Sequence, residues 1–333
     1  MKCIDVHNHL YPQAWMEYLD GRAGSPTMKR TGPTSMIFYS DDMRLATISR
    51  AGHYDPEPRV KDIDEYGIST QILSLTCPSV ELITAKEGVE WARRVNDYMA
   101  EVCAKYPGRF YAYATLPYQD VTESVKELER AHKLGAKGVM LFSNLAGKPV
   151  YAPEFYPIYE AAAEYDMPFF IHPASPITSD AMRVAQMPLP LYGFIMDTTM
   201  AISGLIFTGV LEKLPKLKFI HGHLGGVFPY MVGRINDCYR SYADDHGYYK
   251  LPKEPSEYYK EQVWDDVISF HIPSMKCALE YMGADHLLIG TDYAHPIGGP
   301  TKAAEFVRKL QLSQEDTEKI FYKNAMKLFH IDP

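Results

Sequence analysis

The sequence has few cysteines, and their arrangement argues against a disulfide-stabilised fold. The five cysteines are scattered along 333 residues, are odd in number and form no Cys-x-x-Cys pair. Small secreted domains that depend on disulfides have instead an even number of cysteines in closely spaced patterns. We therefore expect free thiols and a reducing compartment.

The sequence also lacks a membrane-spanning segment and a secretion signal. Its longest apolar stretch, at 201–211, is interrupted by Ser203, Gly204, Thr208 and Gly209 and is too short to cross a bilayer. No positively charged segment leads into an apolar run near residue 1, so no signal peptide is expected. Together with the cysteine pattern, these absences favour a soluble protein of the cytoplasm.

An excess of positive charge is likewise missing. The formal net charge is −8 at pH 7, the isoelectric point is about 5.8, and no basic stripe runs along the chain. Nucleic acids and anionic membranes bind clustered lysine and arginine, so neither is an expected partner. Hydrophobic residues make up 46% of the chain and aromatic residues 13%, which is ample for a large core.

What the sequence does contain is a regular alternation of apolar, strand-like runs and helix-like segments. Amphipathic stretches that end at glycine or proline follow the runs, as at 84–106 and 120–134. The runs with strand character lie at 3–10, 69–75, 110–116, 138–142, 168–172, 217–223, 262–269 and 286–292.

This alternation predicts an α/β protein with a (β/α)₈ fold, the TIM barrel, because eight strands each followed by a helical segment are what that barrel requires. We expect a single domain over 1–333. Loop insertions are expected after the first and fifth strands, at 11 to about 55 and at 173 to about 198, and the first of them should be irregular. An open doubly wound sheet is the alternative, but no Gly-x-Gly-x-x-Gly motif follows any strand.

Four of the eight expected strands end in residues that commonly bind metal ions. The carboxyl ends of barrel strands gather at one mouth, where active sites are found. Side chains alternate along a strand, so a His-x-His sequence presents both imidazoles on one face. Independent core histidines are the alternative, but they do not explain why the runs stop at one end in imidazole or carboxylate. The residues are His7 and His9 on the first strand, His172 on the fifth, His221 and His223 on the sixth, and Asp292 on the eighth.

These motifs together resemble the amidohydrolase superfamily, within the branch of aminocarboxymuconate-semialdehyde decarboxylase and related aromatic-acid decarboxylases. The resemblance spans nearly the whole chain and is more specific for the branch than for the reaction. The matching segments are IDVHNH at 4–9, FIHP at 170–173, GHLGG at 222–226 and GTDY at 290–293, with shorter matches at 64–68 and 233–234.

The resemblance implies one divalent metal ion held by His7, His9, His172 and Asp292, with an open position for water or substrate. A catalytic site, unlike a structural one, keeps such a position open. A barrel that only stores metal is therefore not expected. Relatives with His-x-His on the first strand resemble zinc enzymes, whereas relatives with glutamate at the first position often use other divalent ions. His7 thus favours zinc.

Two further roles near the metal follow from the resemblance. His223 matches the histidine that acts as an acid/base beside the metal rather than as a ligand, and Asp292 is expected to relay protons as well as bind the metal. His221 departs from the family pattern. For it we prefer a hydrogen-bonded role behind the site or in the core over metal ligation, which stays open.

Arginines are expected to bind the substrate, because a guanidinium grips a carboxylate through two parallel hydrogen bonds. Arg234 matches a family arginine that reaches into the neighbouring subunit's site, which implies a homodimer or larger homo-oligomer. Arg44 or Arg50 could supply the counterpart from the first insertion, and the sequence does not choose between them. His295, three residues after Asp292, is a further candidate for substrate contact.

The function that these residues favour is non-oxidative decarboxylation of an unsaturated or aromatic carboxylic acid by a metal-dependent carboxy-lyase. The alternative is metal-dependent hydrolysis of a lactone, an amide or a carbon–carbon bond at the same site. The arginines and the GHLGG motif favour decarboxylation. One departure leaves the exact substrate open: segment 174–198 has no tryptophan where the semialdehyde decarboxylase has one in its active site.

Overall fold

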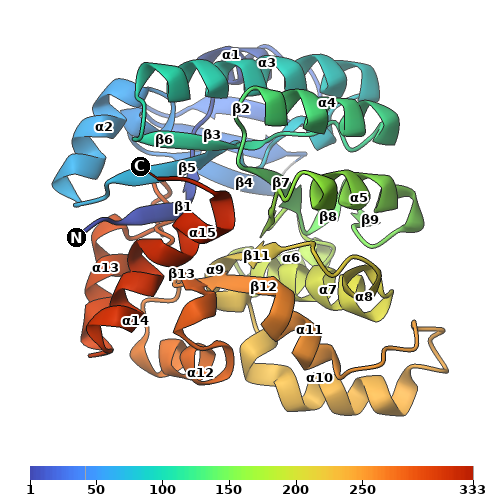
Figure 1. The fold of residues 1–333 in the computed structure, drawn as a ribbon. Coiled ribbons are helices and arrows are strands. Elements are labelled where there is room, and N and C mark those ends of the chain that lie inside the picture. Colours follow the sequence, from blue (N-terminus) through green and yellow to red (C-terminus); the bar gives the residue numbers. More distant parts are fainter. Residues whose placement is uncertain (42, 333) are drawn as a thin grey trace.

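The core of the fold is a ring of eight parallel strands (Figure 1). A computed structural model describes residues 1–41 and 43–332. The ring is closed next to β1, where the backbone N–H of Val6 donates to the carbonyl of Ile289 at 2.9 Å and Asn8 forms a parallel bridge with Tyr293. The predicted (β/α)₈ barrel is thus confirmed. Around the sheet the strands are β1 (Ile4–His9), β5 (Thr70–Ser74), β6 (Phe110–Ala114), β7 (Gly138–Phe142), β10 (Phe169–His172), β11 (Phe219–His221), β12 (Val263–Asp266) and β13 (Leu287–Leu288).

Helices cover the outside of the ring (Figure 1). Local sequence explains their starts: the longest begins with a capping box in which the side chains of Thr84 and Glu87 bond each other's backbone N–H groups. None of the helices in the described chain is long and apolar enough to cross a membrane. The helices that follow strands are α2 (Pro56–Glu65), α3 (Ala85–Lys105), α4 (Val121–Lys133), α5 (Tyr156–Glu164), α7 (Gly193–Phe207), α8 (Val210–Lys213), α10 (Phe228–Tyr242), α11 (Pro255–Gln262), α12 (Ile272–Met282), α13 (Pro300–Lys309), α14 (Gln314–Glu318) and α15 (Asn324–Phe329).

The prediction that the first insertion is irregular is wrong. After α1 (Gln13–Asp20) it forms an antiparallel sheet of β2 (Thr27–Arg30), β3 (Met36–Ser40) and β4 (Met43–Ile48). β3 buries alternate side chains, Met36 and Phe38, against the core, which is the pattern of a half-buried strand. Glycine and proline in the same segment concealed that pattern. The second insertion contains α6 (Ser179–Val184) and the first turns of α7, and a small hairpin, β8 (Asn144–Leu145) and β9 (Lys148–Pro149), precedes α5.

Several strands end earlier than the sequence predicts, and two of them matter for the site. β11 stops at His221 and β13 at Leu288. Beyond these ends the backbone does not stay extended: the four residues from His223 to Gly226 all have positive φ, and so does Asp292, with φ 55°. A chain in this left-handed region cannot continue a strand. His223 and Asp292 therefore lie on the segments that follow the strands, still at the mouth of the barrel.

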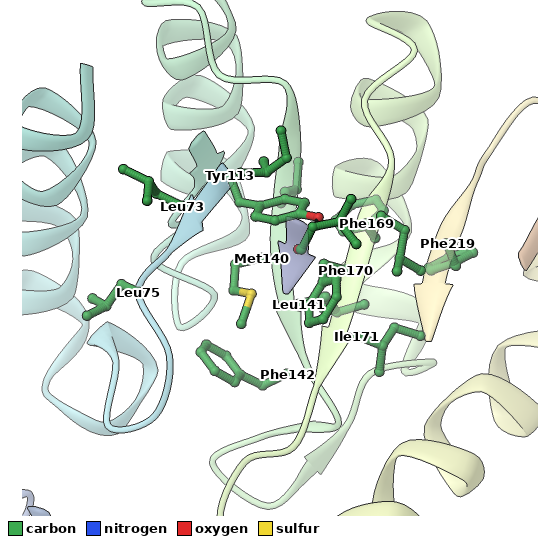
Figure 2. Packing of buried hydrophobic residues seen from close by; sticks show 14 of the residues in the cluster. Leu73, Leu75, Tyr113, Met140, Leu141, Phe142, Phe169, Phe170, Ile171 and Phe219 are labelled. Atoms are coloured by element: carbon green, nitrogen blue, oxygen red, sulfur yellow. The ribbon is translucent and has the colours of Figure 1, made fainter. Parts of the chain in front are cut away.

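Aromatic side chains fill the barrel below the mouth and support the first metal-binding histidine. Figure 2 shows Tyr113 and Phe170 in this interior. Their ring centroids lie 5.5 Å apart, and the Tyr113 hydroxyl donates to the carbonyl of Val6 at 3.0 Å, across the barrel. Phe170 in turn meets the ring of His7 edge-on at 4.7 Å. The imidazole of His7 is thus packed against aromatic side chains inside the barrel.

Candidate active site

The mouth of the barrel brings together four side chains that can bind one metal ion. His7, His9, His172 and Asp292 each offer a nitrogen or oxygen ligand atom, and these atoms all lie within 4.8 Å of one another. All four residues are buried, and none is more than 6% exposed. They come from β1, from β10 and from the segment after β13, which are distant in the sequence. The predicted site for a divalent metal ion is therefore confirmed.

Asp266, the last residue of β12, orients His7. Its Oδ2 accepts a hydrogen bond from Nδ1 of His7 at 2.6 Å, which leaves Nε2 of His7 to face the other ligands. That Nε2 is buried with no hydrogen-bond partner in the described chain and lies 3.6 Å from Oδ1 of Asp292. A buried nitrogen without a partner is costly, and a metal ion would satisfy it. A carboxylate behind a metal-binding histidine is the common arrangement in metalloproteins.

The other two histidines are oriented in a similar way. Nδ1 of His9 lies 2.9 Å from Oγ of Ser74, and Nδ1 of His172 lies 2.9 Å from Oγ1 of Thr76. Nε2 of His9 faces Oδ1 of Asp292 at 3.2 Å. Three imidazoles and one carboxylate form a donor set that suits divalent ions such as Zn²⁺ and Mn²⁺.

Burial and mutual contact set the protonation of these ligands. Burial lowers the pKa of His9 and the pKa of His172 well below the ordinary value, so both are neutral. Burial alone would raise the pKa of Asp292, but the surrounding imidazoles, His295 first, lower it. For His7, burial alone would lower the pKa, but the hydrogen bond to the carboxylate behind it raises the pKa overall. Neutral imidazole and ionised carboxylate are the forms that bind metal.

A buried arginine supports the strand that carries His7 and His9. The side chain of Arg59, on α2, is fully buried; its Nη1 donates to the carbonyl of His9 at 2.7 Å and its Nη2 to Oδ1 of Asn8 at 2.5 Å. Its Nε donates to Oε1 of Gln71 on β5 at 2.8 Å. Burial lowers the pKa of Arg59 to about 10, which still leaves the guanidinium charged near neutral pH. This one side chain ties α2, β1 and β5 together under the metal site.

His223 lies beside the four metal-binding residues, on the turn that follows β11. Its ring centroid is 4.9 Å from that of His7 and 5.9 Å from that of His172. Its Nδ1 has no hydrogen-bond partner among the described residues, and the side chain is partly exposed to the cavity above the site. Burial, followed by the nearby His7 ring, lowers the pKa of His223. The residue lies beside the ligand cluster and is not one of its four members.

A cavity of about 1140 Å³ opens above the metal-binding residues. Its charged and titratable lining includes Arg44 from β4, Arg183 from α6, Asp292, His223 and His295. An apolar space with a few polar groups at one end is typical of a site for a small organic molecule. The rest of the lining is largely apolar and includes Met43, Met187, Leu189, Phe194, Ile268 and Phe270.

The structure separates the arginines that the sequence proposed. Arg44 lines the cavity, whereas Arg50 is absent from its described lining and instead donates to the Tyr66 hydroxyl at 2.8 Å and pairs with Asp62 at 3.7 Å. Arg234 is exposed on α10 and is likewise absent from the described lining. Of these three arginines, Arg44 is therefore the one that lines the cavity of its own chain, as far as the described residues show.

His221 takes the hydrogen-bonded position that the sequence analysis preferred. It is fully buried, and its Nδ1 lies 2.8 Å from the hydroxyl oxygen of Tyr259. Burial lowers the pKa of His221 to about 3, so the ring is neutral. The residue is not among the four whose ligand atoms cluster in the described chain.

Sequence analysis missed Asp266 and Arg59. β12 ends in Asp265 and Asp266, and this is the same strand-end signal that identified His172 and Asp292. The signal was overlooked because the strand looked less regular than its neighbours. Arg59 gave no comparable signal: it lies in a charged helix, and only the packing of α2 shows that its side chain points inward.

Comparisons with known proteins agree with this arrangement. A family model described as Amidohydrolase matches residues 4–331. The gamma-resorcylate decarboxylase of Polaromonas sp. is 34% identical over 286 residues, which cover 82% of this chain and 87% of that protein. The 2-amino-3-carboxymuconate-6-semialdehyde decarboxylase of Dictyostelium discoideum is 29% identical over 337 residues, which cover 99% of this chain and 92% of that protein.

A solved structure extends the comparison to the fold. The 5-carboxyvanillate decarboxylase from Novosphingobium aromaticivorans, in complex with manganese and 4-hydroxy-3-methoxy-5-nitrobenzoic acid, has a TM-score of 0.85 and 26% sequence identity to this chain. The match covers 99% of this chain and 96% of that one. The chain belongs to the amidohydrolase family, in the branch of the aminocarboxymuconate-semialdehyde and gamma-resorcylate decarboxylases.

Proposed function

We propose that this protein removes the carboxyl group of a hydroxylated aromatic acid as carbon dioxide, without oxidation. The broader class predicted from the sequence, a metal-dependent decarboxylase, is confirmed by the family and by its relatives. The observation that carries the proposal is the position of His223. Its imidazole stands beside the metal-binding cluster but outside it, and both face one largely apolar cavity.

We propose zinc as the resident metal ion, held by His7, His9, His172 and Asp292. Three imidazole donors and an open side toward the cavity fit catalytic zinc, although a relative in this branch was solved with manganese. When bound, the ion would polarise oxygen atoms of the substrate as a Lewis acid. Metal analysis of protein purified without added metal, followed by reloading with each ion, tests the choice: a higher turnover with manganese would overturn it.

The chain's own residues would hold the acid and move one proton. Arg44 and His295 both line the cavity. Arg44 would pair with a carboxylate there, and His295 would contact a ring substituent. His223 would deliver a proton to the ring carbon that bears the carboxyl group. The bond to the carboxyl carbon then breaks, its electron pair returns to the ring, and carbon dioxide leaves. Asp292 would relay the proton that restores His223.

The reaction type is tested by product analysis. Zinc-loaded protein would be incubated with a panel of hydroxybenzoic acids, muconate-type acids and lactones, and carbon dioxide release and product mass would be followed. Decarboxylation removes the mass of carbon dioxide, whereas hydrolysis adds the mass of water. Carbon dioxide from a hydroxybenzoic acid is the expected result, and addition of water with no release of carbon dioxide would overturn the proposal.

We also propose that the working unit is a homodimer in which Arg234 of each protomer completes the other's site. α10 carries both Tyr230, which is 85% exposed and lines the cavity, and the exposed Arg234, so the start of the helix lies at the mouth. A guanidinium on its exposed side is better placed to serve a neighbour's cavity than its own.

Mixing two inactive variants tests this arrangement. His223→Ala and Arg234→Ala protomers, once exchanged, should form mixed dimers in which one of the two sites carries neither change. Recovered turnover should reach at most about half of normal for a fully mixed dimer. No recovery after confirmed subunit exchange would remove Arg234 from the partner's site.

We place the protein in the cytoplasm. Its five cysteines are all free thiols, and two of them, Cys3 and Cys77, are buried. Free thiols of this kind are maintained in a reducing compartment. Fractionation of cells that express the protein at its natural level is the direct test.

A further inference from the structure

The turn that carries His223 adopts a conformation that its own residues disfavour. Four successive residues, His223, Leu224, Gly225 and Gly226, have φ of 58°, 55°, 68° and 59°. Left-handed backbone is unfavourable for residues other than glycine, and two of these four have side chains. Contacts from the surrounding structure must therefore hold the turn.

Two hydrogen bonds hold the edges of the turn. The backbone N–H of Leu224 donates to Oδ1 of Asp266 at 3.1 Å, and the backbone N–H of Val227 donates to Oγ1 of Thr199 at 3.0 Å. Neither of these contacts the centre of the turn, at Gly225. What supports the centre is a group of three buried polar side chains.

These three side chains form a hydrogen-bonded network below the turn, made of His221, Tyr259 and Asp265. The hydroxyl of Tyr259 donates to Oδ1 of Asp265 at 2.6 Å, and Nδ1 of His221 lies 2.8 Å from the same hydroxyl oxygen. All three residues are 0% exposed. The ring of Tyr259 is stacked on Phe228, with centroids 3.9 Å apart and planes 11° apart, so the hydroxyl has a fixed position.

The backbone of the turn lies directly on this network. A β-carbon at Gly225 would be 2.6 Å from both Oδ2 of Asp265 and the hydroxyl oxygen of Tyr259. One at Gly226 would meet Oγ1 of Thr199 and the carbonyl oxygen of Ile195 first, and Nε2 of His221 at 3.2 Å. Only glycine allows so close an approach. The network therefore limits how closely the backbone of the turn can approach β12 and α11. This limit also sets the position of His223 relative to the metal-binding residues.

Burial disfavours the charged form of all three members of the network, which suits a supporting role. Burial raises the pKa of Asp265 well above the ordinary range, and burial lowers the pKa of His221 to about 3. Burial also raises the pKa of Tyr259. Neither His221 Nε2 nor Asp265 Oδ2 has a hydrogen-bond partner within the described part of the chain, so the network receives little help from elsewhere.

We propose that His221, Tyr259 and Asp265 are positioning residues that hold the left-handed turn and thereby fix the imidazole of His223 beside His7. They act through His223 and do not contact the substrate. The inference rests on the proposed acid/base role of His223 for its kinetic consequence, but its structural consequence is independent of any activity.

The first test removes one hydroxyl from the network. Tyr259→Phe keeps the ring stacked on Phe228 but leaves His221 and Asp265 without their shared partner. The matched control is Tyr159→Phe, because Tyr159 is equally buried and its hydroxyl donates to the carbonyl of Val150 at 2.7 Å, outside this network. In Tyr259→Phe, amide hydrogen exchange of segment 223–227 should become about tenfold faster, and in the control it should not change.

The kinetic arm separates positioning from simple loss of stability. Tyr259→Phe should lower kcat by about 10- to 100-fold, as expected when a catalytic group is displaced by a fraction of an ångström to one ångström, with KM and metal content unchanged. The control should keep its kcat even if it loses comparable thermal stability. Equal kcat in both variants, with unchanged exchange in segment 223–227, would overturn the proposal.

A second pair of variants at Asp265 keeps the proposal testable if Tyr259→Phe folds poorly. Asp265→Asn retains an oxygen that accepts from Tyr259 in a side chain of the same shape, so it should keep nearly full kcat and normal exchange in the turn. Asp265→Ala lacks that oxygen without adding bulk under the turn and should reproduce the defect of Tyr259→Phe. A lower kcat and faster exchange in Asp265→Asn than in the other variant would overturn the proposal.

The outcomes also separate this inference from the proposed function. If no aromatic acid is turned over, the proposed function fails, but hydrogen exchange in segment 223–227 still reports whether the network holds the turn. If decarboxylation is found and the exchange and kcat of Tyr259→Phe match the control, the function stands and the positioning network is wrong.

Discussion

The two sides of the metal site are built in opposite ways. On one side, His7 and His9 lie on β1, whose six residues are all buried and which pairs along its length with β5. On the other side, His223 lies on a turn whose four residues all have positive φ. Ladder hydrogen bonds and burial on both faces hold a strand, whereas the turn depends on a few side-chain contacts.

This difference suits the different tasks of the two sides. Metal ligands must keep fixed distances from one another, and a central strand supplies that rigidity from the barrel itself. A group that transfers a proton must stand at one height above the metal and cannot be part of the same strand. The comparison predicts that changes on the strand side alter stability and metal binding, whereas changes on the turn side alter turnover.

The largest effect is expected on the turn side. His223→Ala should lower kcat by about 10²–10⁴-fold, the usual loss for a general acid–base group, while the protein keeps its metal. The exposed His246, in the loop after α10, offers a control variant, His246→Ala, with unchanged kcat. Steady-state kinetics and metal analysis of the same preparations provide the measurement. A loss of metal in His223→Ala would break the comparison, because it would make His223 a ligand.

A large loss of stability is expected on the strand side. Arg59→Met removes the guanidinium that donates to the carbonyl of His9 and to the side chains of Asn8 and Gln71. Leaving these buried acceptors unpaired should lower the free energy of unfolding by about 3–5 kcal/mol. Arg240→Met, which removes an exposed arginine on α10, should change stability little. Denaturant unfolding of both variants is the measurement. Equal free energies of unfolding would show that β1 does not depend on the hydrogen bonds of Arg59.

Glu81, in the segment that follows β5, should make the stability of the strand side depend on pH. Burial raises the pKa of Glu81 to about 7 from an ordinary value of 4.5, so the folded state holds this proton more tightly than the unfolded state. The stability that the protonated Glu81 carboxyl contributes is complete below pH 4.5 and is lost as the pH rises to about 7. The loss can reach about 3 kcal/mol, since each pKa unit corresponds to about 1.4 kcal/mol.

Glu81→Gln tests this pH dependence because it cannot ionise. Its melting temperature should match that of the native protein near pH 4.5 and exceed it at pH 8. Thermal unfolding of both proteins across this range is the measurement. Parallel curves at all pH values would show that Glu81 ionises in the folded state with an ordinary pKa.

The smallest effect is expected at the residue that joins the two sides. Asp266 accepts hydrogen bonds both from the ring of His7 and from the backbone N–H of Leu224 in the turn. Asp266→Asn should weaken metal binding by about 10- to 100-fold, as is usual when a carboxylate behind a ligand is lost. The adjacent variant Asp265→Asn should leave metal affinity unchanged. Chelator competition measures both, and equal affinities would mean that His7 is oriented without Asp266.

Sequence patterns predicted the barrel and the gathering of metal-binding side chains at its mouth, because both depend on residue type and on the order of strands. The choice of the four ligands among those side chains came from the family resemblance. Apolar runs that stop in histidine or aspartate are enough to identify the mouth of a barrel. The same reasoning, applied to the end of β12, would have predicted that Asp266 also lies at the mouth, near His7. The sheet within the first insertion was missed because its strands alternate only partly and lie among glycines and prolines.

The features that the sequence could not show depend on backbone conformation and on distant packing. Nothing in the residues His223 and Leu224 indicates a left-handed conformation, since both types usually avoid it. Arg59 looks like one more charge on a polar helix, and only the docking of α2 against β1 reveals its contacts. Arg44 could be preferred to Arg50 only after the cavity was located.

The origin of the cavity walls has a consequence for engineering. Metal ligands lie on or just after the strands of the ring, whereas side chains from β4 and from the second insertion, such as Arg44, Met187 and Phe194, form walls of the space above them. Directed evolution can therefore explore the walls and the metal site separately. Libraries confined to those three positions should yield variants that accept different acids and retain the metal content of the parent, whereas libraries on β1 should mostly yield inactive protein without metal.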